Sequence, residues 1–156
     1  SYSITTSYPL DGITTNAFFA FSASRYLRAA YTGPVIQLRE NGGNTTKDFK
    51  VLAGSLVTND ANEDTVSEWL TANSATIAFV SVWYDQSGNG RNFQQTDNSL
   101  QPRLTLAWSN GKPAIHNPHN GGTVLTRLSS AASISGFTSA NQSEMFGVVD
   151  SEVSES

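Results

Sequence analysis

The sequence predicts a mainly β fold, an antiparallel β-sandwich with one or two short helices. Its apolar residues fall in short runs that are rich in β-branched and aromatic side chains and are separated by turn residues. Only 14% of the 156 residues are charged, and Ser, Thr, Asn, Gln and Gly take their place, which suits exposed strands and long turns. Asn110-Gly111, between two of the apolar runs, is a strong signal for a β-hairpin.

The composition excludes several function classes. A chain of 156 residues fits one domain with a real core. A net charge of −4 without a basic stripe argues against binding to nucleic acid or to an anionic membrane. The lack of cysteine excludes disulfides, cysteine metal sites and thiol nucleophiles. No apolar run reaches membrane-spanning length, and the first residues carry no signal-peptide pattern.

The beginning of the chain predicts an arm followed by a helix. Residues 1–15 are polar and rich in turn residues, so we expect an extended arm there and a single sandwich domain over residues 16–156. Apolar residues then recur at roughly helical spacing as far as Gly33-Pro34, which predicts a helix between Asn16 and that pair. These apolar residues are Phe18, Phe21, Tyr26 and Ala30.

A second helix and the strands follow. Asp60 and Glu63 have the spacing of a capping box, and behind them Val66, Trp69 and Leu70 line one face of a short helix. Residues 75–84 are the most apolar run and predict a central strand. The expected strands are 35–39, 49–52, 75–84, 104–108, 112–116, 124–128 and 145–149.

Five short sequence blocks between Ser24 and Ile115 are distinctive. They read Ser24-Arg25-Tyr26-Leu27-Arg28, Tyr31-Thr32-Gly33-Pro34-Val35-Ile36-Gln37-Leu38-Arg39, Val82-Trp83-Tyr84-Asp85-Gln86-Ser87-Gly88-Asn89-Gly90, Gln101-Pro102-Arg103 and Gly111-Lys112-Pro113-Ala114-Ile115. Together they resemble the N-terminal half of the α-L-arabinofuranosidase B catalytic domain, a concanavalin-like, jelly-roll type of sandwich. They equally resemble a related module of bacteriophage structural proteins, tail fibres among them.

The resemblance implies the sandwich fold without the active site. In the arabinofuranosidases, the paired carboxylates that cleave the glycosidic bond lie further along than this chain extends. Residues 145–150 resemble the strand just before that catalytic half. The adjacent cysteine pair of the enzymes' sugar pocket has no counterpart, because the chain has no cysteine.

The loop from Asp85 to Gly90 resembles the front of a calcium-binding loop. Oxygen side chains stand at alternate positions before a glycine, which makes Asp85, Ser87 and Asn89 candidate calcium ligands. Such a loop normally ends in glutamate at about its twelfth position, and here that position is Thr96. We therefore favour a structural turn, in which Asp85 accepts backbone N–H groups and the glycines adopt positive φ, and we expect no other cofactor.

Two further clusters give weaker signals. His116 and His119 could share a metal ion on a helix, but Pro118 between them argues against a helix. Asp150 and Glu152 share strand parity, as a glycosidase pair could, yet acidic residues near a terminus are more typical of a solvated tail. We name no catalytic residue on this basis.

Aromatic side chains and sequons complete the candidate sites. Trp69 and Trp83 lie in apolar patterns and are expected in the core. Tyr84 and Trp108, near strand ends, are the candidates for stacking against a sugar ring, although core packing competes for both. The sequence also contains two N-glycosylation sequons, Asn44-Thr45-Thr46 and Asn141-Gln142-Ser143. They are relevant to glycosylation only in a eukaryotic secretory pathway.

These observations favour a non-catalytic structural protein at a virion surface or outside the cell, such as a bacteriophage tail-fibre, decoration or capsid-surface component. Its expected partners are other virion subunits in a homo-oligomer, with a possible glycan ligand and neither nucleic acid nor membrane. The arm could add to the sheet of a neighbouring subunit. Two alternatives stay open: a fragment or relative of an α-L-arabinofuranosidase that hydrolyses plant polysaccharide, and a free-standing carbohydrate-binding module.

Overall fold

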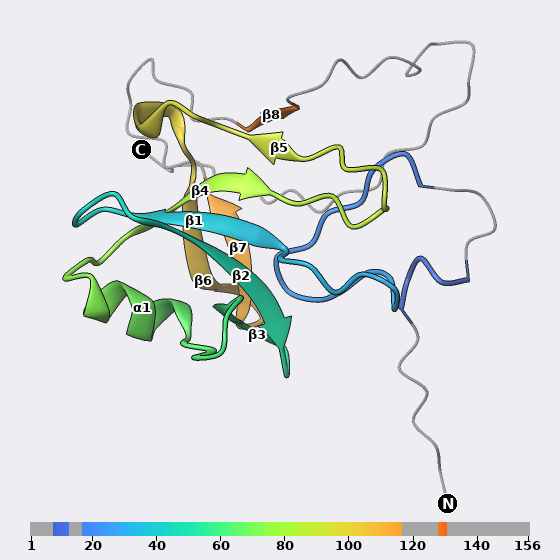
Figure 1. The fold of residues 1–156 in the computed structure, drawn as a ribbon, viewed down its shortest axis with the longest axis horizontal. Helices are drawn as coiled ribbons and strands as arrows, with labels where there is room; N and C mark the ends of the chain where they lie inside the picture. The colour runs from blue at the N-terminus through green and yellow to red at the C-terminus, as the bar shows by residue number, and fades with distance from the viewer. Residues whose placement is uncertain (1–7, 13–16, 117–127, 131–156) are drawn as a thin grey trace, which may run out of the picture.

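The computed structural model describes residues 8–12, 17–116 and 128–130, which form antiparallel strands and one short α-helix (Figure 1). The elements are β1 (Ile36–Glu40), β2 (Thr46–Leu52), β3 (Ser55–Thr58), α1 (Val66–Ala72), β4 (Ala78–Trp83), β5 (Phe93–Gln94), the 3-10 helix η1 (Asn98–Leu100), β6 (Arg103–Ser109), β7 (Lys112–His116) and β8 (Ser129–Ser130). No helix within these ranges is long and apolar enough to cross a membrane.

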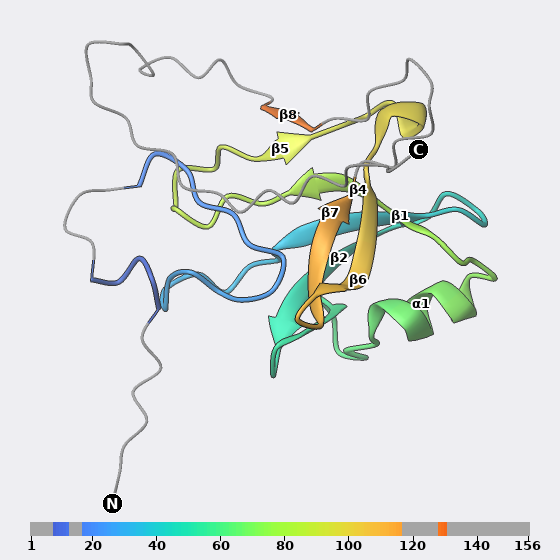
Figure 2. The ribbon, with the colours of Figure 1, turned by 180° about the vertical axis from the view of Figure 1, so that it is seen from behind.

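The strands pair in the order β3-β2-β1-β4-β5-β8, and each neighbouring pair is antiparallel. β6 joins this sheet through one pair, Phe79 with Arg103, and otherwise pairs with β7. The front and back views show the β6–β7 hairpin crossing one side of β1 and β2, so that two layers face each other (Figures 1 and 2). The fold is mainly β and is consistent with the predicted sandwich.

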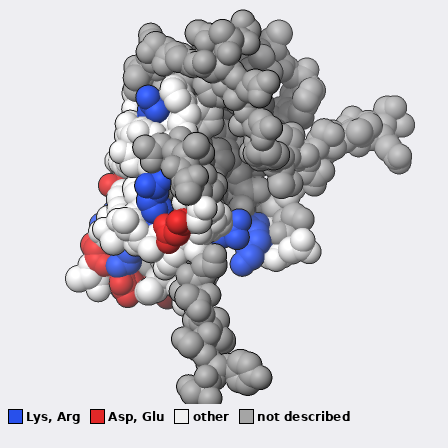
Figure 3. All heavy atoms as spheres, turned by 90° about the vertical axis from the view of Figure 1, so that its right-hand side faces the viewer, with Lys and Arg blue, Asp and Glu red and all other residues white. Residues whose placement is uncertain are grey.

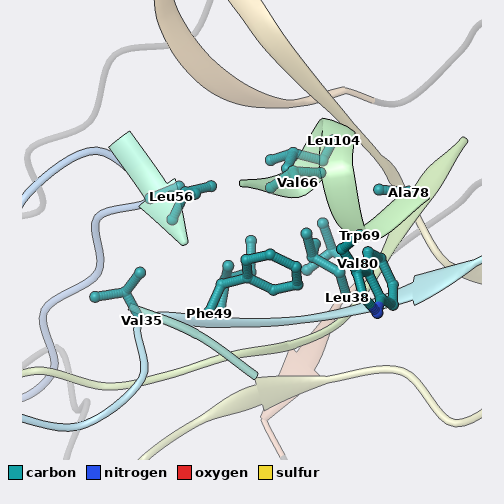
Figure 4. Close-up of a cluster of buried hydrophobic side chains, with 11 residues drawn as sticks. Val35, Leu38, Phe49, Leu56, Val66, Trp69, Ala78, Val80 and Leu104 are labelled. Atoms are coloured by element: carbon teal, nitrogen blue, oxygen red, sulfur yellow. The ribbon is translucent and has the colours of Figure 1, made fainter. Parts of the chain in front are cut away.

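The apolar core of the described residues lies between the sheet, α1 and the β6–β7 hairpin. Phe49 of β2 packs edge-on against Trp69 of α1, with ring centroids 5.3 Å apart. Leu38 and Val80 come from neighbouring strands of the same sheet face and are fully buried. Figure 4 shows these side chains meeting Val66 of α1 and Leu104 of β6. Burying one face of the sheet in this way leaves its other face to polar side chains.

The predicted β-hairpin at Asn110-Gly111 is confirmed. Both turn residues have positive φ, 52° and 69°, which is the geometry that matches the twist of two antiparallel strands. The pairing of β6 with β7 is irregular between Thr105 and Ser109, opposite Pro113. Proline has no N–H group to give to a neighbouring strand, so the pairing is interrupted there.

The first predicted helix is wrong, because residues 17–34 form bends and turns. Two of their backbone N–H groups donate to the side chains of Asp85 and Gln86, so these donors are not available to helical carbonyls. The apolar spacing serves an aromatic cluster instead, in which Phe21 stacks on Phe93 with centroids 4.6 Å apart. Contacts distant in sequence override the helical pattern here.

The second helix is confirmed, but its predicted cap is wrong. The capping box is formed by Thr65 and Glu68, with each side chain bonded to the backbone of the other residue. Asp60 instead accepts from Thr58 Oγ1 at 2.9 Å, and Glu63 has a positive φ of 54°, outside the helix. Both positions therefore belong to the turn before the helix.

Five of the seven predicted strands lie in the described residues. The strand expected at 112–116 has the predicted bounds, and those expected at 35–39, 49–52, 75–84 and 104–108 are present with shifted ends. Of the expected arm, residues 8–12 form a turn in which Leu10 N–H donates to Leu27 O at 2.8 Å. Residues 124–127 and 145–149 lie outside the described ranges.

Charged side chains on the described surface are mixed in sign. On the face in Figure 3, basic and acidic groups are interspersed among uncharged side chains. Two ion pairs contribute to this pattern, Lys47 with Asp60 at 2.5 Å and Lys50 with Glu63 at 2.6 Å.

Candidate functional site

Polar side chains gather around Asp48 on the face of the sheet that does not pack against α1. Gln37 of β1 lies directly opposite Asp48 of β2, and its Nε2 donates to Asp48 Oδ1 at 3.0 Å. The hydroxyl of Tyr84 donates to the same oxygen at 2.8 Å. All three side chains are half-buried. We call Gln37, Asp48, Ser81 and Tyr84 the Asp48 cluster.

A β-bulge in β4 brings Tyr84 to this face. Gln37 pairs with Val82 while Leu38 pairs with Val80, so Ser81 is an extra residue between them. Ser81 Oγ donates to Gln37 Oε1 at 3.0 Å, which fixes the bulge to the neighbouring strand. Since side chains alternate along a strand, the extra residue places Tyr84 on the same face as Gln37 rather than on the core face.

The phenols of Tyr84 and of nearby Tyr31 stay protonated at neutral pH. Burial raises the pKa of Tyr84, and the hydrogen bond that it donates to Asp48 raises it further. Burial also raises the pKa of Tyr31 to about 12, with smaller contributions from Tyr26, Asp85 and Asp48. These phenols therefore act as hydrogen-bonding groups and not as proton acceptors in catalysis.

The carboxylate of Asp48 has one oxygen in use and one available. Oδ1 accepts from Gln37 and Tyr84, whereas no described residue donates to Oδ2. A half-buried carboxylate oxygen beside neutral phenols is a suitable acceptor for a ligand hydroxyl group.

Glu40 and Asp85 are buried more deeply than Asp48, and both carboxylates accept hydrogen bonds within their own loops. Glu40 accepts from the backbone N–H groups of Gly42, Gly43 and Thr45, the last at 2.6 Å. Burial alone would raise the pKa of Glu40, but these backbone donors outweigh it and lower the pKa. Its oxygens therefore stabilise the β1–β2 turn.

The carboxylate of Asp85 likewise accepts hydrogen bonds from its own loop and from segment 17–34. Its Oδ1 accepts from the N–H groups of Ala20 and Ser87, both at 2.8 Å, and its Oδ2 accepts from Ser87 Oγ at 2.8 Å and Arg91 N at 3.0 Å. Gly88 and Gly90 have positive φ, 94° and 67°. These are the contacts of the structural turn that the sequence favours.

The candidate calcium ligands are close together but bonded to protein. Ser87 donates to Asp85, and the Nδ2 of Asn89 donates to Ala17 O at 2.8 Å and Phe18 O at 3.0 Å. Calcium binding by Asp85, Ser87 and Asn89 stays a prediction. Across residues 8–12, 17–116 and 128–130, no group of three or more acidic or histidine side chains could hold a metal ion.

Gln86 is a residue whose importance the sequence did not reveal. Its side chain is fully buried; Oε1 accepts from Leu27 N at 2.8 Å, and Nε2 donates to Ser22 O at 3.1 Å. Its backbone N–H donates to Ala20 O at 2.7 Å. The side chain and backbone of Gln86 together hold the irregular segment 17–34 against the end of β4.

The structure separates the two candidate sugar platforms. β4 and β6 are antiparallel and pair at Phe79 and Arg103. Tyr84 comes five residues after Phe79, and Trp108 comes five residues after Arg103. Because the two strands run in opposite directions, the two aromatic residues lie on opposite sides of that pair. At about 3.3 Å per residue, this spacing puts each backbone roughly 16 Å away from the pair along its own strand. Tyr84 belongs to the Asp48 cluster, whereas Trp108 packs edge-on against His116, with centroids 4.9 Å apart.

Three other sequence candidates, His119, Asp150 and Glu152, lie outside the described residues. Trp69 is buried in the core as expected, and Trp83 is half-buried, with its ring 5.1 Å from that of Phe21.

Asp48 was missed, although the sequence held a signal for it. The predicted loop 41–44 lies at equal distances from Gln37 and Asp48 along the chain. In an antiparallel hairpin, residues at equal distances from the turn face each other. The pairing of an amide with a carboxylate could have been read from that symmetry.

Comparisons with known proteins agree with the resemblance in the sequence. The family model described as "Alpha-L-arabinofuranosidase B, catalytic" matches residues 11–116. Two proteins described as "Probable alpha-L-arabinofuranosidase B" align over 76 residues, one from Aspergillus terreus at 32% identity and one from Aspergillus fumigatus at 30%. No solved structure matches the chain significantly.

The aligned region covers 49% of this chain and 14% of each relative, so the chain spans a small part of the curated proteins that it matches. Both relatives are fungal, and the resemblance to bacteriophage proteins stays a prediction. The family model covers well over half of the chain, including the segments that form the Asp48 cluster and the Asp85 loop. The chain therefore belongs to the α-L-arabinofuranosidase B catalytic-domain family.

Proposed function

We propose that this chain is the N-terminal part of the catalytic sandwich of a glycoside hydrolase that removes α-L-arabinofuranosyl groups from plant polysaccharide. The observation that carries the proposal is the match of residues 11–116 to the catalytic-domain family. The names of the two curated relatives support the same linkage specificity.

In this proposal, the chain supplies framework and sugar contacts. The Asp85 loop and Gln86 hold the irregular segment 17–34 on the sheet. The Asp48 cluster offers a carboxylate oxygen to the hydroxyl groups of the glycan. Hydroxyl groups are the principal polar feature of an arabinofuranosyl unit, and charged acceptors form the stronger hydrogen bonds with them.

The bond-breaking step is assigned to the whole gene product. Glycoside hydrolysis uses two carboxyl groups about 5–10 Å apart across the scissile bond. Glu40 and Asp85 are unsuitable for either role, because backbone donors occupy their oxygens. We expect the pair further along than this chain extends, as the family resemblance implies.

A hydrolase of plant polysaccharide works outside the cell, so we propose an extracellular location. The virion role, the homo-oligomer with other virion subunits and the free-standing binding module remain predictions that no comparison supports. They would be favoured if the natural gene product bound glycans or particles without hydrolysing any arabinofuranoside.

The test is hydrolysis by the natural gene product that contains this chain. We expect it to release 4-nitrophenol from 4-nitrophenyl α-L-arabinofuranoside, and to release little from the β-D-xylopyranoside and β-D-galactopyranoside controls. Arabinose released from arabinoxylan or arabinan would establish the polymer substrate. A folded gene product that hydrolyses no arabinofuranoside would refute the proposal.

A further inference from the structure

We propose that Asn44 is an acceptor for an N-linked glycan when the chain passes through a eukaryotic secretory pathway. Asn44-Thr45-Thr46 meets the sequence requirement of Asn, any residue except Pro, then Ser or Thr. The fungal origin of both relatives makes such a pathway relevant. The inference concerns a modification and does not depend on the proposed hydrolytic function.

The sequon lies where a glycan can project into solvent. It spans the end of the β1–β2 turn and the first residue of β2, and Asn44, Thr45 and Thr46 are all exposed. Gly42 and Gly43 precede it, so no bulky side chain stands on that flank of the turn. Glycans are tolerated at exposed turns of this kind, because the sugar displaces only water.

The orientation of the Asn44 amide suits modification at its nitrogen. Oδ1 accepts from Arg39 Nη1 at 2.5 Å, while no described residue accepts from Nδ2. The glycan bond forms at Nδ2 and leaves the amide oxygen in place. A modified Asn44 can therefore keep its contact with Arg39.

Arg39 gives that contact a rigid anchor. Its side chain is only 6% exposed, and its Nε donates to Gln101 Oε1 at 2.6 Å. Its guanidinium lies 4.5 Å from the centre of the Phe79 ring. With the oxygen end of the Asn44 amide held on this buried group, the nitrogen end is directed away from it.

Asn44 has structural roles of its own, and these roles do not involve the hydroxyl of Thr46. Asn44 has a positive φ of 64°, which asparagine tolerates better than most residues, and it bonds to Arg39. Neither feature requires a hydroxyl group at position 46. Thr46 is the first residue of β2, where a β-branched side chain is favoured, and its hydroxyl, which makes no hydrogen bond with a described residue, completes the sequon.

The experiment uses secretion of the full chain from yeast behind a secretion leader. All variants carry Asn141→Gln, which removes the second sequon. Thr46→Ala removes the first sequon and leaves the contact between Asn44 and Arg39 intact, and Thr46→Ser is the matched control that keeps the sequon. Intact mass is measured before and after treatment with peptide N-glycosidase F.

We expect a glycan mass on the parent and on Thr46→Ser that the enzyme removes, and none on Thr46→Ala. Peptide mapping should place the resulting Asn-to-Asp conversion at position 44. Secreted, folded parent protein without a glycan at Asn44 would overturn the inference. Melting provides a second check: the glycosylated parent and the same chain made without glycosylation in bacteria should have similar melting temperatures, and a much lower value for the glycosylated protein would contradict the retained contact with Arg39.

Discussion

Tyr84 donates its phenolic hydrogen to Oδ1 of Asp48 over 2.8 Å, across 36 positions of sequence. The bond exists because Ser81 is an extra residue in β4. Without that bulge, Tyr84 would lie on the face of Leu38 and Val80, which is the core face. One inserted residue thus turns a candidate core aromatic into part of a polar site.

Replacing Tyr84 with Phe removes this hydrogen bond and keeps the ring. Because Asp48 is charged and half-buried, we expect the free energy of unfolding to fall by about 1–2 kcal/mol. Urea denaturation at pH 7 measures the change. Tyr8→Phe is the control, since the Tyr8 hydroxyl makes no hydrogen bond with a described residue, and it should change stability little. If both variants lowered the free energy of unfolding equally, the hydrogen bond from Tyr84 to Asp48 would contribute no measurable stability.

Replacing Gln86 with Leu tests how the irregular segment is held. The fully buried side chain bonds to Leu27 N and Ser22 O, and leucine leaves both backbone groups without a partner. We expect a loss of roughly 2–4 kcal/mol, because each buried unsatisfied group costs about 1–3 kcal/mol.

Hydrogen exchange separates this local effect from a general one. In Gln86→Leu, the amide of Leu27 should exchange much faster, while the amide of Trp69 in α1 should follow only the global loss of stability. Unchanged protection at Leu27 would mean that the segment is held by its aromatic contacts instead.

Most strands could be predicted from the sequence because their signals are local. The apolar run at 75–84 and the Asn110-Gly111 turn each identify an element without knowledge of the rest of the chain. β3 was missed because it follows a turn at Ala53-Gly54, and alanine at a φ of 49° is not a recognised turn residue. β5, of two residues, is too short to give any pattern.

The irregular segment and the site depend on contacts that no local pattern records. Residues 17–34 have helical apolar spacing, yet their N–H groups bond to Asp85 and Gln86 about 60 positions away. Tyr84 could be selected as a strand-end aromatic. Its partner Asp48 emerged only with the register of the β1–β2 hairpin and the bulge in β4.

The lowered pKa of Asp60 predicts that the folded protein loses stability in acid. The hydrogen bonds that it accepts from Lys47 and Thr58 lower the pKa of this carboxyl to about 2, below its value in an unfolded chain. A lowered pKa in the folded state gives stability that is present at neutral pH and lost as pH falls from about 4 towards 2. Asp60→Asn should flatten the decline of the melting temperature over that window.

Asp64→Asn is the matched control for this measurement. Asp64 is also half-buried, and its carboxylate has no hydrogen bond or ion pair with a described residue. The control should therefore retain the acid-dependent decline of the parent. High salt should weaken the decline, because the pair of Asp60 with Lys47 is partly exposed and is screened by ions. A parent melting temperature that is constant from pH 4 to about 2 would contradict the assignment.

Asp48→Asn tests whether the Asp48 cluster contacts sugar. Asparagine keeps an oxygen for Tyr84 and Gln37, so the fold should survive, but the charge available to a ligand hydroxyl is lost. Hydrogen bonds to charged groups are worth about 1.5–3 kcal/mol, so we expect kcat/KM for an arabinofuranoside to fall roughly tenfold or more in the natural gene product. Asp64→Asn should have no effect on kcat/KM. If Asp48→Asn kept the kcat/KM of the parent, the Asp48 cluster would not contact the sugar. The arabinofuranosidase proposal would still stand, because only a lack of activity in the parent enzyme refutes it.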